Sequence, residues 1–287
     1  MKQLHDWPFS AVGAPVPDMA SVRSRGEIRL GVRQVAGATA VAEAYQAGSL
    51  RLRLPRTARD AAPGFVILNT AGGLVDGDQL DQRLRWGAST AASVTTQAAE
   101  KVYRMEGAGA TIATRIDIEA GAGAEWLPQE TILFDRARLT RSTEVHLAED
   151  ASFLGCEAVV FGRTAMGETV DEGRLDDRWR IWRGGRLVYA DALRLDGGIR
   201  ALMARAAIGA GAAAMAILIH ISPTAVSLHA VVREALAAAI GLAAASVSGA
   251  LLIVRLLARD GAALRHDLTI ALAALRSGKP LPRVWGC

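Results

Sequence analysis

The chain has 287 residues, of which 51% are hydrophobic and 22% are charged. A chain of this length can bury roughly three quarters of its unfolded surface, and the composition excludes a wholly disordered protein. The formal net charge is +4, but the arginines are scattered along the sequence instead of forming a block. This pattern disfavours a nucleic-acid partner.

The cysteines and the N-terminus give information about the compartment. Cys156 and Cys287 are the two cysteines, too few for a disulfide framework or a four-ligand zinc site, so a reducing compartment fits. The first residues, MKQLHDWPFS, include an acid and lack the apolar run of a secretory signal. We therefore expect a cytoplasmic protein, with residues 1–20 poorly ordered.

One segment has the length of a membrane span. Residues 235–254 are 20 positions without a charge, which would suffice to cross a bilayer as a helix. Gly241, Gly249 and two serines interrupt the run, however. We interpret it as the end of a helix, a turn and a buried strand, and we expect no membrane segment.

Period-two alternation predicts strands through the middle of the chain. The clearest examples are residues 110–119 and 139–147. In the second example, Arg141 and Thr143 share the face that carries the leucines and valine. Apolar segments also flank Gly184-Gly185, a pair typical of a two-residue hairpin turn.

Helical periodicity is found only late in the chain. One apolar stripe lies within residues 228–239, with Ser227 as its expected N-cap. A second stripe lies within residues 264–275, opened by Asp260 and closed by Gly278. Many strands followed by helix, strand and helix, without βαβ alternation, predict a mainly β fold with two helices in a single domain over residues 1–287.

The glycine-rich segment GGLVDGD, residues 72–78, is the first candidate for a binding site. It lacks the Gly-Lys-Ser/Thr ending of a nucleotide-binding loop, which occurs nowhere in the chain. As a calcium loop it fails too, because Leu80 stands where a third oxygen ligand should follow Asp76 and Asp78. A tight turn between strands is the favoured interpretation.

Two further segments concentrate polar side chains, TTQAAEKVYR at residues 95–104 and EWLPQETILF at residues 125–134. Their hydroxyl, amide and carboxylate oxygens suit a loosely held divalent cation, although a polar network inside the core would use the same residues. Paired carboxylates such as Glu125 and Glu130 also allow a glycoside hydrolase, which the low aromatic content disfavours. From the residues alone, Glu157 and Glu168 are expected to be surface acids at turns.

Histidine gives an argument from absence. The five histidines occur in no HxH, HxxxH or HExxH pattern, so a tight imidazole site for nickel, copper or zinc is not expected. His229 is predicted to lie on the solvent side of its helix. The nucleophile elbow GxSxG is also missing.

Taken in order, GGLVDGD, TTQAAEKVYR, EWLPQETILF and GRTAMGE (residues 162–168), with the ending LPRVWGC, resemble the urease accessory proteins of the UreD family, also called UreH. The resemblance covers most of the chain. It implies a β-helical body of stacked strands with two helices. The family usually has a glycine where this chain has Asp76, whereas Asp78 matches the family's acid.

The resemblance also implies a function. It predicts a chaperone, not an enzyme, that scaffolds UreF and the GTPase UreG on the urease apoprotein and passes Ni²⁺ onward without a tightly bound cofactor. The expected path residues are Asp78, Thr95, Thr96, Gln97, Glu100, Glu130 and Glu168, and the expected partner contacts are Arg283 and Trp285. A glycan-processing or glycan-binding β-solenoid and a metal-free structural adaptor are the alternatives.

Overall fold

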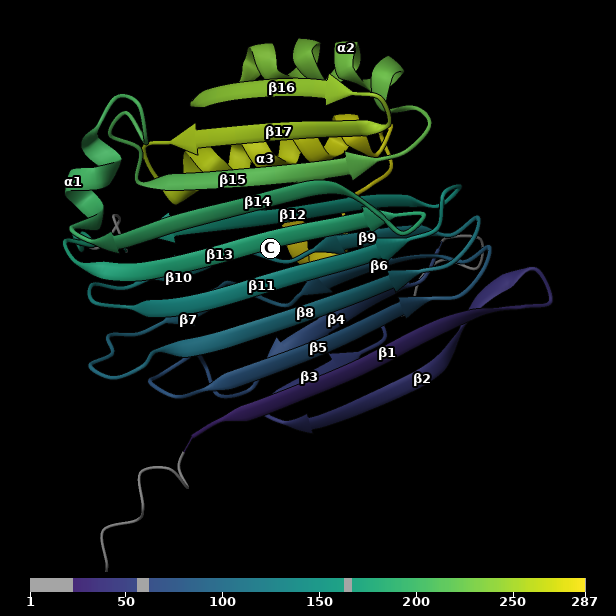
Figure 1. Cartoon of the computed structure of the whole chain (residues 1–287), viewed down its shortest axis with the longest axis horizontal. Helices are drawn as coiled ribbons and strands as arrows, with labels where there is room; N and C mark the ends of the chain where they lie inside the picture. The colour runs from purple at the N-terminus through teal and green to yellow at the C-terminus, as the bar shows by residue number, and fades with distance from the viewer. Residues whose placement is uncertain (1–22, 56–61, 163–166, 287) are drawn as a thin grey trace, which may run out of the picture.

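The computed structural model describes residues 23–55, 62–162 and 167–286. The expectation for residues 1–20 lies outside this part of the chain. Within it, strands predominate and form two stacked sheets (Figure 1). The mainly β, stacked-strand fold that the sequence predicts is confirmed.

The first sheet has seven strands in the order β14-β13-β11-β8-β5-β1-β2. Its members are β1 (Arg25–Val35), β2 (Ala38–Gly48), β5 (Gln79–Trp86), β8 (Ala110–Ile118), β11 (Arg138–Leu147), β13 (Gly173–Arg183) and β14 (Arg186–Gly197). We call it sheet A.

The second sheet, sheet B, has ten strands, eight of them in the order β16-β17-β15-β12-β9-β6-β4-β3. Those eight are β3 (Leu50–Arg53), β4 (Gly64–Asn69), β6 (Ala91–Thr96), β9 (Gly123–Leu127), β12 (Ser152–Phe161), β15 (Ala214–Ile221), β16 (Leu242–Ser248) and β17 (Leu251–Ala258). The short strands β7 (Glu100–Val102) and β10 (Thr131–Leu133) pair with each other, and β10 also pairs with β12.

Between β4 and β13 the chain passes back and forth between the sheets. Strands β5, β8, β11 and β13 are parallel neighbours in sheet A, and β4, β6, β9 and β12 are parallel neighbours in sheet B. Each pass therefore adds one of these strands to each sheet, which produces the stacked coil. Side chains that point between the sheets come from segments far apart in the sequence.

Alternation explains why these segments form strands. In β8, Ala110, Ile112, Thr114 and Ile116 are buried between the sheets, while the residues that alternate with them face outward. The hairpin predicted at Gly184-Gly185 is confirmed, since β13 and β14 are antiparallel and both glycines have positive φ, 55° and 78°. Glycine adopts such angles without steric cost.

Helices α2 (Ala225–Ala235) and α3 (Gly261–Leu275) cover the outer face of sheet B beside β15, β16 and β17 (Figure 1). The Asp260 side chain caps α3 by accepting a hydrogen bond from Ala263 N at 2.8 Å, as predicted. Gly278 follows α3 with φ 77°. Ser227 is not the N-cap of α2, because that helix begins earlier, after Thr224.

The structure has one more α-helix than expected in its described part, the short α1 (Ile199–Ala204), along with the 3₁₀ turns η3 (Leu236–Ala238) and η4 (Arg283–Gly286). A six-residue helix is too short to produce a clear apolar stripe. Its two buried residues, Ile199 and Met203, join the core between the sheets.

The uncharged residues 235–254 are resolved into the end of α2, η3, and two antiparallel strands, β16 and β17, joined at Gly249. The sequence predicted one buried strand here, and the structure has two strands. Strand β16 is a sheet edge whose residues alternate between half-buried and exposed. Among the described residues, no helix combines the length and the hydropathy that crossing a membrane requires.

A polar cavity between the two sheets

A cavity of about 200 Å³ lies between sheets A and B. Its outer end is lined by the loops that follow β4 and β6, where Gly72 and Gln97 are exposed. Its inner lining includes buried polar side chains from both sheets, namely Gln82, Thr114, Thr131, Arg141 and Glu157. The cavity thus joins the surface to a polar region inside an otherwise apolar core.

Arg141 organises the inner end of the cavity. Its side chain points from β11 into the space between the sheets and is only 4% exposed. Asp177, its neighbour on β13, accepts hydrogen bonds from Nε at 3.1 Å and Nη2 at 2.6 Å. Glu157 approaches from sheet B, with Oε2 at 2.6 Å from Arg141 Nε, and Thr131 Oγ1 accepts from Nη1 at 2.9 Å.

Burial sets the charge of this group, which we call the Arg141 triad: Arg141, Asp177 and Glu157. Burial raises the pKa of Glu157, Arg141 opposes that effect, and the Asp177 carboxylate adds to it. The two carboxylates keep the pKa of Arg141 above its usual value although burial acts in the opposite direction. One guanidinium therefore faces two acids, and one negative charge stays uncompensated when both acids are ionised.

Two buried side-chain oxygens near the triad have no hydrogen-bond partner within the described residues. They are Gln82 Oε1 and Thr143 Oγ1. Gln82, Thr114 and Thr143 are aligned in register across β5, β8 and β11, on the inward face of sheet A. Buried polar groups are normally paired, so this oxygen-rich row has free capacity to accept water or a hydrated cation.

Glu100 lies at the outer end of the cavity. Its two carboxylate oxygens accept from Asn69 Nδ2 at 3.0 and 3.2 Å. Burial raises the pKa of Glu100 to about 7, the Asn69 hydrogen bond lowers it, and the nearby Asp78 charge raises it. A carboxylate with this pKa changes its charge near neutral pH.

The cavity brings together three of the seven predicted path residues, Thr96, Gln97 and Glu100. Thr95 points to the opposite face of sheet B, where its Oγ1 accepts from Trp285 Nε1 at 3.2 Å. Glu130 pairs with Arg265 at 3.2 Å. Glu168 and Asp78 are also absent from the cavity lining.

Asp78 is buried and holds the backbone of its own turn. It is 1% exposed, and its two oxygens accept from Ser24 N at 2.7 Å and Val75 N at 2.9 Å. The segment around it is the tight turn that the sequence favoured, with positive φ at Gly72, Gly73 and Gly77. Asp76, where the family usually has glycine, accepts from Gly109 N at 2.7 Å and so ties this turn to the start of β8.

Replacing Asp78 with asparagine is expected to destabilise the protein by about 1–3 kcal/mol, because one buried backbone N–H would face an amide NH₂ instead of an acceptor. The measurement is the urea unfolding midpoint. Asp81→Asn is the matched control, since Asp81 forms an exposed ion pair with Arg83 and its loss should cost little. Equal midpoints for the two variants would contradict a structural role for Asp78.

Sequence reasoning missed the Arg141 triad and Gln82. Glu157 is not a surface acid at a turn, since it lies within β12 and is 5% exposed. A signal was present for Arg141, which shares the apolar face of its strand. A charge at such a position needs a buried partner, but the sequence does not reveal which acid supplies it.

Other predicted groups are engaged elsewhere. Glu125 forms a two-pronged pair with Arg276, with both N···O distances 3.0 Å, and Asp135 accepts from the backbone of residues 171 and 172. His229 is half-buried and its Nε2 lies 3.2 Å from Ala245 O, so the expectation of a solvated ring is wrong. No group of three or more potential metal-ligating His, Cys, Asp or Glu side chains occurs among the described residues.

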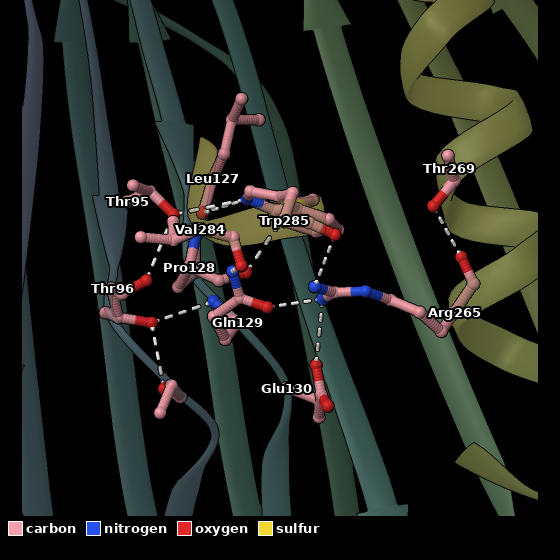
Figure 2. A network of polar contacts seen from close by, with 12 residues as sticks. Thr95, Thr96, Leu127, Pro128, Gln129, Glu130, Arg265, Thr269, Val284 and Trp285 are labelled. Atoms are coloured by element: carbon pink, nitrogen blue, oxygen red, sulfur yellow. Dashed lines mark hydrogen bonds and ion pairs between the residues drawn. The ribbon is translucent and has the colours of Figure 1, made fainter. Parts of the chain in front are cut away.

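Of the two predicted partner contacts, Trp285 is 6% exposed and packs in the chain's own core, whereas Arg283 is exposed. The indole Nε1 of Trp285 donates to Thr95 Oγ1 and, at 3.3 Å, to Leu127 O (Figure 2). Arg265 stacks over the ring at 4.3 Å. In this conformation the ring is not available to another protein.

The sequence matches the family model of the UreD urease accessory protein over residues 24–286. The urease accessory protein UreD of Rhizobium etli is 48% identical over 263 residues, which cover 92% of this chain and 95% of that protein. The UreD of Methylobacterium sp. (strain 4-46) is 48% identical over 269 residues, covering 92% and 95%, and that of Xanthobacter autotrophicus is 47% identical over 265 residues, covering 92% and 90%.

A strand-built body with these relatives defines an accessory protein of urease, not an enzyme. The resemblance seen in the four sequence segments is confirmed. The chain belongs to the UreD family.

Proposed function

We propose that this protein is a nickel-insertion chaperone whose interior conducts Ni²⁺ toward the urease apoprotein. The single observation that carries the proposal is the polar cavity, which runs from Glu100 at the surface loops to Glu157 in the Arg141 triad. Nickel is the cargo here and not a resident cofactor.

The side chains that line the cavity are better suited to passing Ni²⁺ onward than to storing it. Its donors are carboxylate, amide and hydroxyl oxygens, without a cluster of imidazoles or thiolates in the described residues. Oxygen ligands hold Ni²⁺ less tightly than nitrogen or sulfur ligands do. A conducting site must be favourable enough to enter and weak enough to leave, and the lining suits both requirements.

We further propose that the protein acts in the cytoplasm on a complex with UreF, UreG and the urease apoprotein. The family description, urease accessory protein, supports a partnership with urease. UreF and UreG enter from the family resemblance, and the chain itself has no nucleotide-binding loop. A separate GTPase would therefore have to supply any nucleotide-driven step.

The test is reconstitution of apo-urease with UreF, UreG, GTP, bicarbonate and Ni²⁺, with and without this chain. Nickel per urease active site, measured after removal of free metal, should rise when the chain is present. A nickel content that does not depend on the chain would contradict the proposal. A glycan-cleaving activity of the isolated protein would support the hydrolase alternative instead.

The pKa of Glu100 gives the proposal a pH signature. The ionised form attracts the cation, so the part of nickel delivery that depends on Glu100 should increase from pH 6 to pH 8, around its pKa of about 7. Glu100→Gln should lower delivery at pH 8 and have little effect at pH 6. The measurement is initial delivery rate against pH for both proteins.

The stability of the wild-type fold should change with pH in the direction opposite to nickel delivery. Since burial raises the folded-state pKa of Glu100 from its usual 4.5 to about 7, ionisation destabilises the fold progressively as pH rises through that interval. Glu100→Gln should therefore be more stable than the wild type by about 1–3 kcal/mol at pH 8, and nearly equal to it at pH 4. A stability difference that is the same at both pH values would contradict this assignment.

A further inference from the structure

The C-terminal segment packs behind one wall of the cavity, on the other side of sheet B. Residues 281–286, which include η4 and which we call the strap, lie along the outer face of sheet B beside α3 (Figure 2). Trp285 occupies the space over β6 and β9, where its indole reaches Thr95 and Leu127. The strap therefore lies on the face of sheet B opposite the cavity.

Gln129 connects the strap to the cavity. It belongs to the short segment between β9 and β10, is 6% exposed, and lines the cavity together with Pro128. Its backbone N–H donates to Thr96 Oγ1 at 2.8 Å, and its Nε2 donates to Val284 O at 3.3 Å. One residue thus contacts the cavity lining on one side and the strap on the other.

Arg265 of α3 holds this arrangement together. Its guanidinium stacks on Trp285, donates from Nη2 to Trp285 O at 3.0 Å, and donates from Nη1 to Gln129 Oε1 and Glu130 Oε2 (Figure 2). A planar guanidinium can stack and form several directed hydrogen bonds together, which an ammonium group cannot do. Release of the strap would leave Gln129 Nε2 without its acceptor, Val284 O, and would vacate the site of the indole.

We propose that the strap is a displaceable closure of the cavity wall, positioned by Arg265, whose opening connects the cavity to the α3 side of the molecule. The strap belongs to no strand of either sheet, so it can separate without breaking the strand pairing. Its use as a gate for the cation rests on the function proposed above. Opening itself requires neither nickel nor a partner.

Cys156 is a native reporter of this opening. Its side chain is fully buried in the same cluster as Trp285 and Leu127, with Sγ 3.9 Å from Pro128 O. With Cys287 replaced by serine, a thiol reagent can report on Cys156 alone. Labelling at low urea concentrations measures local opening, because such events depend little on denaturant, whereas global unfolding depends on it steeply.

We expect labelling of Cys156 to be nearly independent of urea at low concentrations. Arg265→Lys keeps the positive charge but loses the stacking on Trp285 and the several directed hydrogen bonds of the guanidinium, so it should accelerate labelling at least fivefold. Deletion of residues 281–286 should accelerate labelling further. Arg255→Lys is the matched control, because Arg255 pairs with Asp191 near the edge of sheet B and should leave labelling unchanged. Circular dichroism checks that each variant is folded.

The proposal is overturned if Cys156 is labelled only at the rate of global unfolding in both the wild type and Arg265→Lys. Nickel delivery to apo-urease provides the second measurement, in which Arg265→Lys should change the delivery rate while Arg255→Lys should not. If Arg265→Lys accelerates the labelling of Cys156 but leaves nickel delivery unchanged, the role of the strap as a gate for the cation is overturned. If the wild type itself delivers no nickel, the proposed function fails, yet the labelling result still decides whether the strap opens.

Discussion

Replacing Arg141 with leucine is expected to destabilise the protein by about 3–5 kcal/mol at pH 8, because the buried carboxylates of Asp177 and Glu157 would lose their cation. For a domain of this size the melting temperature should fall by roughly 10 °C. The loss should be smaller at pH 5, because burial raises the pKa of Glu157 and this acid then holds a proton and needs no cation. Thermal unfolding at both pH values provides the measurement.

Arg115→Leu is the control for that prediction. Arg115 lies on β8, the strand beside Arg141, but it faces outward and pairs with Asp117 at 3.1 Å with both side chains about half exposed. Such pairs contribute less than about 1 kcal/mol. Adding Glu157→Gln and Asp177→Asn to Arg141→Leu should restore part of the lost stability. Equal effects of the two arginine replacements would contradict the role of Arg141 as the cation that compensates the buried acids.

At pH 8 and above, where Glu157 can ionise although burial raises its pKa to about 8, Glu157→Gln is expected to reduce nickel delivery about tenfold or more while leaving the fold intact. Glutamine keeps the shape and one acceptor oxygen but removes the negative charge that attracts a cation at the inner end of the cavity. A tenfold loss corresponds to about 1.4 kcal/mol of lost interaction, which is modest for a charge in a buried site. The rate of nickel arrival in apo-urease is the measurement.

The same variant should be at least as stable as the wild type above neutral pH, because burial raises the pKa of Glu157 and so opposes its ionisation. Lower delivery with equal or greater stability separates a role in transfer from a role in folding. Glu144→Gln, which removes an acid from the outward face of β11, should change neither quantity. Full delivery by a variant with both Glu100 and Glu157 neutralised would favour a metal-free adaptor.

The sequence predicts local features of the fold well. Strand alternation, the Gly184-Gly185 turn and the Asp260 cap depend on neighbouring residues, and each is found in the structure. The errors also have local causes. Helix α1 is too short to show a period, and β16 is rich in alanine, which favours helix.

The site was harder to predict, because the face to which a side chain points depends on strand register. Thr95 and Thr96 are adjacent, yet one meets Trp285 and the other lines the cavity, since successive residues of a strand point to opposite faces. Cys156 and Glu157 are divided in the same way. The Arg141 triad joins three strands of two sheets, and only the three-dimensional structure brings them together.

The contact between Trp285 and Thr95 spans 190 residues of sequence. During synthesis, at about 5–20 residues per second, β6 would leave the ribosome many seconds before its covering tryptophan. Parallel pairing between distant strands is intrinsically slow, so the nascent body would spend that interval with the surface over β6 and β9 uncovered. This part of the core should therefore be completed only after residues 281–286 have been synthesised, and a variant without them would retain an exposed apolar surface of the kind that chaperones and proteases recognise.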